Sequence, residues 1–112
     1  MRMNVLREEN REVLFVLKNQ NDQCILTDRE IEYLSFVAMG FTNYEIATAL
    51  YVSHSTVKKT LETIFDKLLA NDRANAVAMA FIHQILNDRI LDAVHEKYNL
   101  KEYDRFKRRR LH

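Results

Sequence analysis

Apolar residues recur at helical spacing in three consecutive segments between Leu26 and Val77. Positions that repeat every three to four residues fall on one face of an α-helix, so each stripe predicts a short amphipathic helix. The three stripes are Ile31, Leu34, Val37 and Ala38; Ile46, Ala47 and Leu50; and Val57, Leu61, Ile64, Phe65 and Leu68.

A start signal precedes each stripe. Thr27 is followed three residues later by Glu30, which is the capping box that satisfies backbone N–H groups at a helix N-terminus. Gly40 lies where the same helix is expected to end. The other two helices have similar signals: Thr42 or Asn43 with Glu45 in the first turn, and Ser53.

The segments on either side are less clearly patterned. Residues 4–18 are expected to form a helix or a short strand, because the apolar run 13–17 has no clear period, although the preceding charges favour a helix. A further helix is expected to begin near Asp72. Its apolar stripe continues towards Tyr98 unless Asn87 and Asp88 interrupt it.

The composition favours an all-α fold. The chain has 112 residues, no proline and one glycine, so hairpin turns and glycine-rich phosphate loops are not expected. Hydrophobic residues make up 47% of the chain, enough for the core of one small domain. We divide it into an N-terminal extension (1–25), a helical domain (26–86) and a helical extension with a basic tail (87–112).

Several classes of function find no support. No run of 18 apolar residues predicts a membrane span, and acidic residues interrupt the N-terminus where a signal peptide is apolar. Cys24 is the only cysteine, which fits a reducing, cytoplasmic location. We expect no metal site, cofactor or enzymatic activity, since no catalytic set stands out and three histidines lack ligand spacing: His54, His83 and His95.

Charge is distributed unevenly. Residues 26–86 carry five basic and seven acidic side chains (5 − 7 = −2), whereas residues 87–112 carry eight basic and five acidic ones (8 − 5 = +3). Five of the eight basic residues lie in the motif RFKRRR: Arg105, Lys107, Arg108, Arg109 and Arg110. Beside a nucleic-acid-binding fold, this tail is expected to contact phosphates; otherwise it is solvated charge.

The second and third helices form a helix-turn-helix pattern whose last helix exposes Lys58 and Lys59, and such a helix can enter a DNA groove. Residues 26–86 resemble the LuxR/FixJ/GerE-type helix-turn-helix domain of bacterial transcription regulators. Five blocks carry the resemblance in the family's order and spacing: LTDRE (26–30), GFTNYEIATAL (40–50), VSHSTVKKTL (52–61), IFDKL (64–68) and NDRANAV (71–77).

The resemblance implies a four-helix unit whose helix 53–67 enters the major groove of double-stranded DNA. By position, Lys58, Lys59 and Glu62 are then the base-edge candidates, and the chemistry agrees because lysine donates to guanine and glutamate accepts from cytosine. Glu62 is alternatively an i+4 partner of Lys58. The backbone candidates are Thr42, Asn43, Ser55 and Thr56, to which we add the hydroxyl of Tyr44.

The sequence departs from the family at the turn, where Tyr51 replaces the usual glycine and predicts either a strained left-handed residue or an altered turn. Leu69 replaces another glycine, and Thr60 a common histidine. The 25 residues before Leu26 are too short for a receiver or ligand-binding domain, so we expect a stand-alone DNA-binding domain.

The resemblance also implies that the helix near Asp72 pairs two copies of the chain. Its apolar stripe supports a homodimer seam, although the alternative is packing against residues 13–17 of the same chain. The seam candidates are Val77, Phe81, Ile85, Ile90 and Val94.

The sequence thus predicts a homodimeric, sequence-specific transcription regulator. The acidic domain, Glu62 and Tyr51 keep one alternative open. In this alternative the chain is a protein-interaction module on the same helix-turn-helix scaffold. It binds RNA polymerase or another regulator and binds DNA only weakly.

Overall fold

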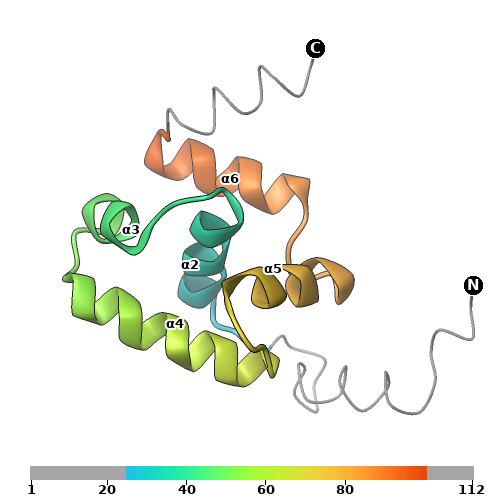
Figure 1. Cartoon of the computed structure of the whole chain (residues 1–112). Coiled ribbons are helices and arrows are strands. Elements are labelled where there is room, and N and C mark those ends of the chain that lie inside the picture. The colour runs from blue at the N-terminus through green and yellow to red at the C-terminus, as the bar shows by residue number, and fades with distance from the viewer. Residues whose placement is uncertain (1–24, 101–112) are drawn as a thin grey trace, which may run out of the picture.

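The computed structural model describes residues 25–100, which form five helices and no strand (Figure 1). The predictions for residues 1–24, Cys24 included, and for 101–112, which hold Arg105, Lys107, Arg108, Arg109 and Arg110, lie outside the described residues. The helices are α2 (Asp28–Ala38), α3 (Asn43–Leu50), α4 (His54–Leu68), α5 (Arg73–Ile82) and α6 (Asp88–Tyr98).

Helix α2 lies at the centre of the described region (Figure 1). Helices α4, α5 and α6 contact it, and α3 packs on α4. Phe36, Ile46 and Ile64, from α2, α3 and α4, are fully buried where these helices meet. The predicted all-α fold with a four-helix unit is therefore confirmed by α2 to α5.

Local hydrogen bonds begin the helices where the sequence predicts. The Thr27 hydroxyl accepts from the Glu30 N–H at 3.1 Å, and the Thr27 N–H donates to the Glu30 carboxylate at 2.9 Å. Thr42 and Glu45 form the same reciprocal pair. Because a capping box satisfies two backbone donors that lack helical partners, both helix starts are fixed by residues three apart.

The other boundaries follow the same logic. Ser53 accepts from the Thr56 N–H at 3.1 Å and begins α4, as predicted, and Asp72 caps α5. Gly40 has a φ of +91° just after α2, a conformation that residues with a Cβ rarely adopt. The sequence left Thr42 and Asn43 as alternative caps of α3, and the structure selects Thr42.

The apolar stripe between Asp72 and Tyr98 belongs to two separate helices, α5 and α6. Gln84 turns the chain with a φ of +61°, and the Ile85 N–H bends back to the Ala80 carbonyl at 2.8 Å. Asn87 then caps α6 by accepting from the Ile90 N–H at 2.9 Å. The interruption left open at Asn87 thus separates α5 from α6.

Helix α6 folds back onto α2 rather than extending away from it (Figure 1). Leu91, Val94 and Leu100 are buried there. The predicted helical extension is confirmed for the part of it that the structure describes. Between residues 25 and 100 no helix combines the length and apolar character needed to cross a membrane.

An ion pair joins α2 to α4. The Lys67 ammonium donates to both carboxylate oxygens of Glu30, at 2.9 and 3.0 Å. Burial alone would raise the pKa of Glu30, but the hydrogen bond from the Thr27 N–H and the charge of Lys67 hold it below 4.5. The same carboxylate therefore caps α2 and ties it to α4.

Candidate nucleic-acid interface

Helix α4 is fixed by one face and leaves the other free. Val57, Leu61, Ile64 and Leu68 are buried, as their spacing predicts, while Phe65 is half-buried. The buried stripe holds the helix along α2 and α3, so its orientation is set by the core. Side chains on the opposite face are then available to a partner.

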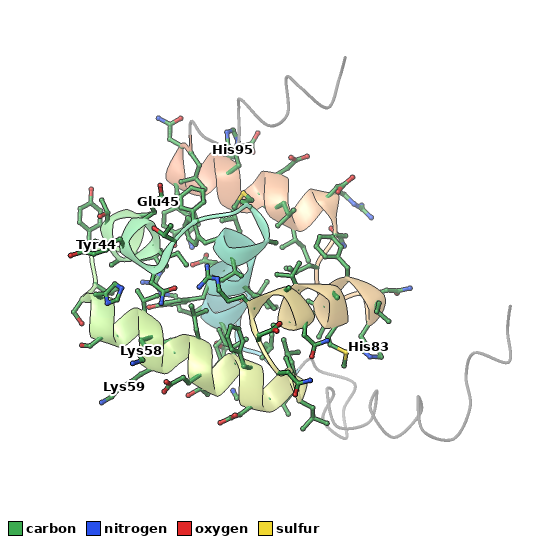
Figure 2. All side chains as sticks on the ribbon, in the orientation of Figure 1. Tyr44, Glu45, Lys58, Lys59, His83 and His95 are labelled. Atoms are coloured by element: carbon green, nitrogen blue, oxygen red, sulfur yellow. The ribbon has the colours of Figure 1, made fainter. Side chains whose placement is uncertain are left out.

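Lys58, Lys59 and Glu62 lie on this free face and are exposed. Figure 2 shows both lysines projecting away from the body of the domain. Within residues 25–100 neither lysine forms a salt bridge, and Glu62 makes no ion pair with Lys58. The proposed i+4 pair is therefore absent from this structure, and two unpaired cations face solvent.

The first turn of α4 presents hydroxyl groups beside the lysines. Ser53 donates to the Thr56 hydroxyl at 2.8 Å and lies 3.2 Å from the Ser55 hydroxyl. All three side chains are exposed at a helix N-terminus, where backbone N–H groups and the helix dipole favour anions. Their chemistry suits phosphate oxygens.

Tyr44 links α3 to this turn. Its ring lies 5.1 Å from that of His54, centroid to centroid, and 75% of the side chain is exposed. Thr42 is also exposed, but its hydroxyl accepts the capping hydrogen bond from Glu45. Tyr44 thus stands beside the start of α4, and its hydroxyl is freer than that of Thr42.

Asn43 is half-buried, and its side-chain oxygen already accepts a hydrogen bond within the domain. Its carboxamide oxygen accepts from the Arg73 guanidinium at 2.6 Å, while the same guanidinium donates to the Phe41 carbonyl at 2.6 Å. Only the Asn43 amide N–H₂ group remains for an external acceptor. Arg73 thus holds α5 against the start of α3, a role that the sequence did not indicate because the two residues are thirty positions apart.

The turn between α3 and α4 is strained as one of the two predicted alternatives requires. Tyr51 has φ 57° and ψ 45°, the left-handed region, and is 95% exposed. Leu69 adopts φ 57° at the end of α4. Both positions keep a left-handed backbone although neither residue is glycine.

The seam candidates separate into exposed and buried residues. Phe81 is 39% exposed, and Val77 and Ile90 are half-buried. Ile85 and Val94 are 8% and 5% exposed, so both pack within their own chain, and their part in a homodimer seam stays a prediction. Ile82, at 68% exposure, was missed because it lies off the helical stripe.

The described residues were also compared with the requirements of a metal site and of an acid–base site. Within residues 25–100 no three potential metal ligands lie close together. Burial lowers the pKa of His83 below 6.5, which favours its neutral form at the end of α5. The exposed groups of this interface are the two lysines and Glu62 on α4 and the hydroxyls on α3 and α4.

Comparisons with known proteins point the same way. The GerE family model, which represents bacterial regulatory proteins of the luxR family, matches residues 24–80. The match ends inside α5, so α6 lies outside it. It covers just over half of the 112-residue chain.

Individual relatives agree with the family match. The response regulator protein VraR of Staphylococcus saprophyticus is 39% identical over 80 residues, which are 67% of this chain and 38% of that protein. VraR proteins of Staphylococcus aureus and Staphylococcus epidermidis are 42% identical over 62 residues, 55% of this chain and 30% of theirs. The chain therefore matches well under half the length of these relatives. The helices, their caps and these matches together establish that the chain belongs to the luxR family of bacterial regulatory proteins and carries its DNA-binding helix-turn-helix domain.

Proposed function

We propose that this chain regulates transcription by placing α4 in the major groove of double-stranded DNA. The observation that carries the proposal is the face of α4 opposite its buried stripe, where Lys58 and Lys59 are exposed and unpaired. Lysine donates to guanine O6 and N7, and Glu62 accepts from cytosine N4. Base contacts by these side chains would make binding sequence-specific.

Backbone contacts would fix the register of α4. Ser55, Thr56 and Tyr44 present hydroxyls, and Thr42 and Asn43 precede Tyr44 directly at the start of α3. Because phosphate contacts position a protein without reading sequence, replacing these residues should weaken binding similarly on every duplex. A homodimer, paired through exposed residues of α5, would read an inverted repeat.

The test begins with DNA sites selected from a random pool by the purified protein. Fluorescence anisotropy then compares the wild type with Lys58→Ala and Lys59→Ala on the selected site and on unrelated DNA. Each variant that removes a base contact should lower the discrimination between the two duplexes by about 1–3 kcal/mol. The matched control is Ala93→Glu on the exposed side of α6, which makes the same change of one charge away from α4.

A second candidate is a protein-interaction module that binds RNA polymerase or another regulator. The specific observation in its favour is the exposed acidic pair Glu62 and Asp66 on α4, which would repel phosphates. This candidate predicts that both lysine variants bind DNA as weakly as the wild type. Equal reductions in affinity in the lysine variants and in Ala93→Glu would also contradict groove reading, because only net charge would then matter.

A further inference from the structure

The start of helix α3 is held by a cation from α5. The Arg73 guanidinium donates from Nη1 to the Asn43 carboxamide oxygen and from Nη2 to the Phe41 carbonyl, both at 2.6 Å. These two acceptors lie on either side of Thr42, the residue that caps α3. Because α3 packs on α4, the Arg73 side chain adds a second support at the start of α3, from α5.

Helix α3 is short, and its first turn is the part least fixed by packing. The helix has eight residues, and its buried side chains, Ile46 and Leu50, come after the first three residues, none of which is buried. Packing therefore fixes the later part of α3, whereas hydrogen bonds fix its start. The Arg73 contact brings a group from another helix into that set of hydrogen bonds.

The position of Arg73 is itself fixed locally. Asp72 caps α5 by accepting from the Asn75 N–H at 2.8 Å, and Ala76, one turn further along, is fully buried. Arg73 is half-buried, and within residues 25–100 it pairs with no carboxylate. It donates instead to two neutral oxygens, so its positive charge is not cancelled by an ion pair.

The contact with Arg73 decides which way the Asn43 carboxamide faces. A guanidinium has donors only, so the atom that it contacts must be the carboxamide oxygen, and the N–H₂ group must take the other position. Within residues 25–100 this N–H₂ group has no hydrogen-bond partner, and it is not buried. It is therefore a donor of fixed orientation that is open to solvent.

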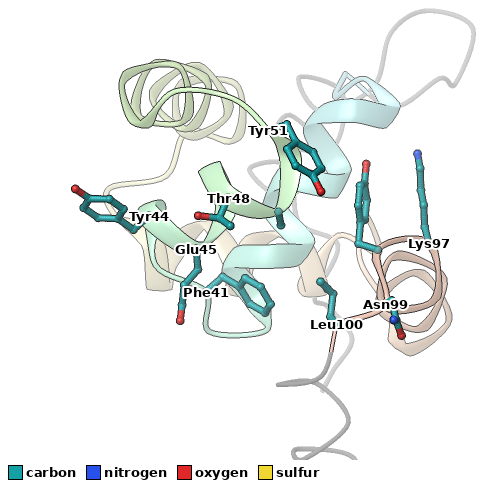
Figure 3. A pocket seen from close by; sticks show the side chains of 10 residues that line it. Phe41, Tyr44, Glu45, Thr48, Tyr51, Lys97, Asn99 and Leu100 are labelled. Carbon is teal, nitrogen blue, oxygen red and sulfur yellow. The ribbon is translucent and has the colours of Figure 1, made fainter.

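The start of α3 lies beside the start of α4. Tyr44, the residue after Asn43, has its ring 5.1 Å from that of His54, centroid to centroid. Figure 3 shows the Tyr44 ring directed away from Lys97 of α6. A DNA strand whose backbone reached the hydroxyls at the start of α4 would therefore also pass the first turn of α3.

We propose that Arg73 is a positioning residue of the DNA interface, which holds the Asn43 carboxamide so that its N–H₂ group donates to a phosphate oxygen of the DNA backbone. The inference rests on the proposed DNA binding. Arg73 acts through Asn43 and does not itself touch the phosphate. A donor that is oriented before binding loses less side-chain entropy when DNA arrives than one that must be immobilised.

Two substitutions in the full-length chain test the two halves of the contact. Asn43→Asp keeps an oxygen for Arg73 but removes the donor to phosphate. Its matched control is Asn99→Asp, the same change at an exposed asparagine that ends α6. Arg73→Lys keeps the charge but replaces a planar fork that reaches two acceptors by a single ammonium. Its matched control is Arg29→Lys, because Arg29 joins α2 to α6 through the Tyr98 hydroxyl.

Fluorescence anisotropy measures binding to the selected site and to unrelated DNA. Asn43→Asp should weaken binding to both duplexes by about tenfold, as expected for a lost hydrogen bond to a charged group. Both duplexes are affected because phosphate contacts carry no sequence information. Arg73→Lys should weaken binding to both by about threefold or more, since the donor is then present but misplaced. Arg29→Lys and Asn99→Asp should bind as the wild type does.

Two further measurements separate positioning from a general effect on the fold. Asn43→Asp should unfold at the same Tm as the wild type or higher, because aspartate offers Arg73 a charged acceptor. Its loss of affinity then cannot come from unfolding. In an Asn43→Ala background, Arg73→Lys should have no further effect on affinity, since the group that it positions is already gone.

The inference would be overturned if Arg73→Lys cost as much affinity in the Asn43→Ala background as in the wild type. It would equally be overturned if Asn43→Asp bound DNA as tightly as Asn99→Asp. Either result leaves groove reading by Lys58 and Lys59 intact. Absence of DNA binding in the wild type would instead contradict the proposed function itself.

Discussion

At the scale of single residues, the most unusual backbone lies at Tyr51 and Leu69. Both hold a left-handed conformation with φ 57°, in which the Cβ atom crowds the following carbonyl. Tyr51 is 95% exposed, so packing of its ring cannot compensate for the backbone strain. The turn between α3 and α4 therefore keeps its geometry at a cost in stability.

Replacement of Tyr51 by glycine should consequently stabilise the fold. Relief of left-handed strain, less the greater freedom of glycine in the unfolded chain, is expected to raise the free energy of unfolding by about 0.5–1 kcal/mol. That corresponds to a rise in Tm of about 2–8 °C, measured by circular dichroism. Tyr51→Ala removes the ring but keeps the Cβ atom; a similar gain in this variant would show that the ring, not the backbone, is responsible.

At the scale of elements, local sequence patterns predict where the helices begin, but they do not predict the contacts between helices that are distant in the sequence. The capping boxes of Thr27 and Thr42 act over three residues, so α2 and α3 begin where the sequence predicts. The Asn43–Arg73 contact depends on how α5 returns to the core, which no local pattern contains. The exposure of Lys58 and Lys59 follows from the helical period of α4 and was predictable, whereas the packing of α6 on α2 was not.

The attachment of α6 should depend on pH through Glu32. Burial raises the pKa of this carboxyl, but hydrogen bonds from Lys97 and Tyr98 outweigh it and hold the pKa below 4.5. A carboxyl with a lowered pKa in the folded state contributes stability above its unfolded pKa and loses it as pH falls through the folded value. The contribution of Glu32 is therefore present at neutral pH and lost in acid.

Thermal unfolding of the wild type and of Glu32→Gln between pH 3 and pH 7 measures this contribution. The difference in Tm between them should be constant near neutrality and shrink below about pH 4.5, where the wild-type carboxyl becomes neutral as well. A difference that stays constant down to pH 3 would mean that the Glu32 charge does not stabilise the fold.

At the scale of the whole molecule, the described helices combine a net negative charge with an exposed apolar surface on α5. Residues 25–100 carry seven basic and ten acidic side chains, net −3, so the described helices do not by themselves form a basic surface that attracts DNA. Their exposed apolar side chains include Phe81 and Ile82 at the end of α5, away from α3 (Figure 1). An acidic domain would gain affinity by presenting two copies of α4 to one duplex, and α5 offers the surface for that pairing.

The proposed dimer makes Phe81→Glu a decisive variant. At 39% exposure, Phe81 can be replaced without emptying the core, yet a carboxylate in a closed seam would lose its hydration without a partner. Sedimentation should show monomers at concentrations where the wild type is dimeric, and anisotropy should show weaker binding to an inverted repeat but unchanged binding to a half-site. Tyr51→Glu, with the same charge change at another exposed aromatic residue, should leave the dimer intact. If Phe81→Glu sediments as the wild type does, or if the wild type is monomeric throughout, α5 is not the seam.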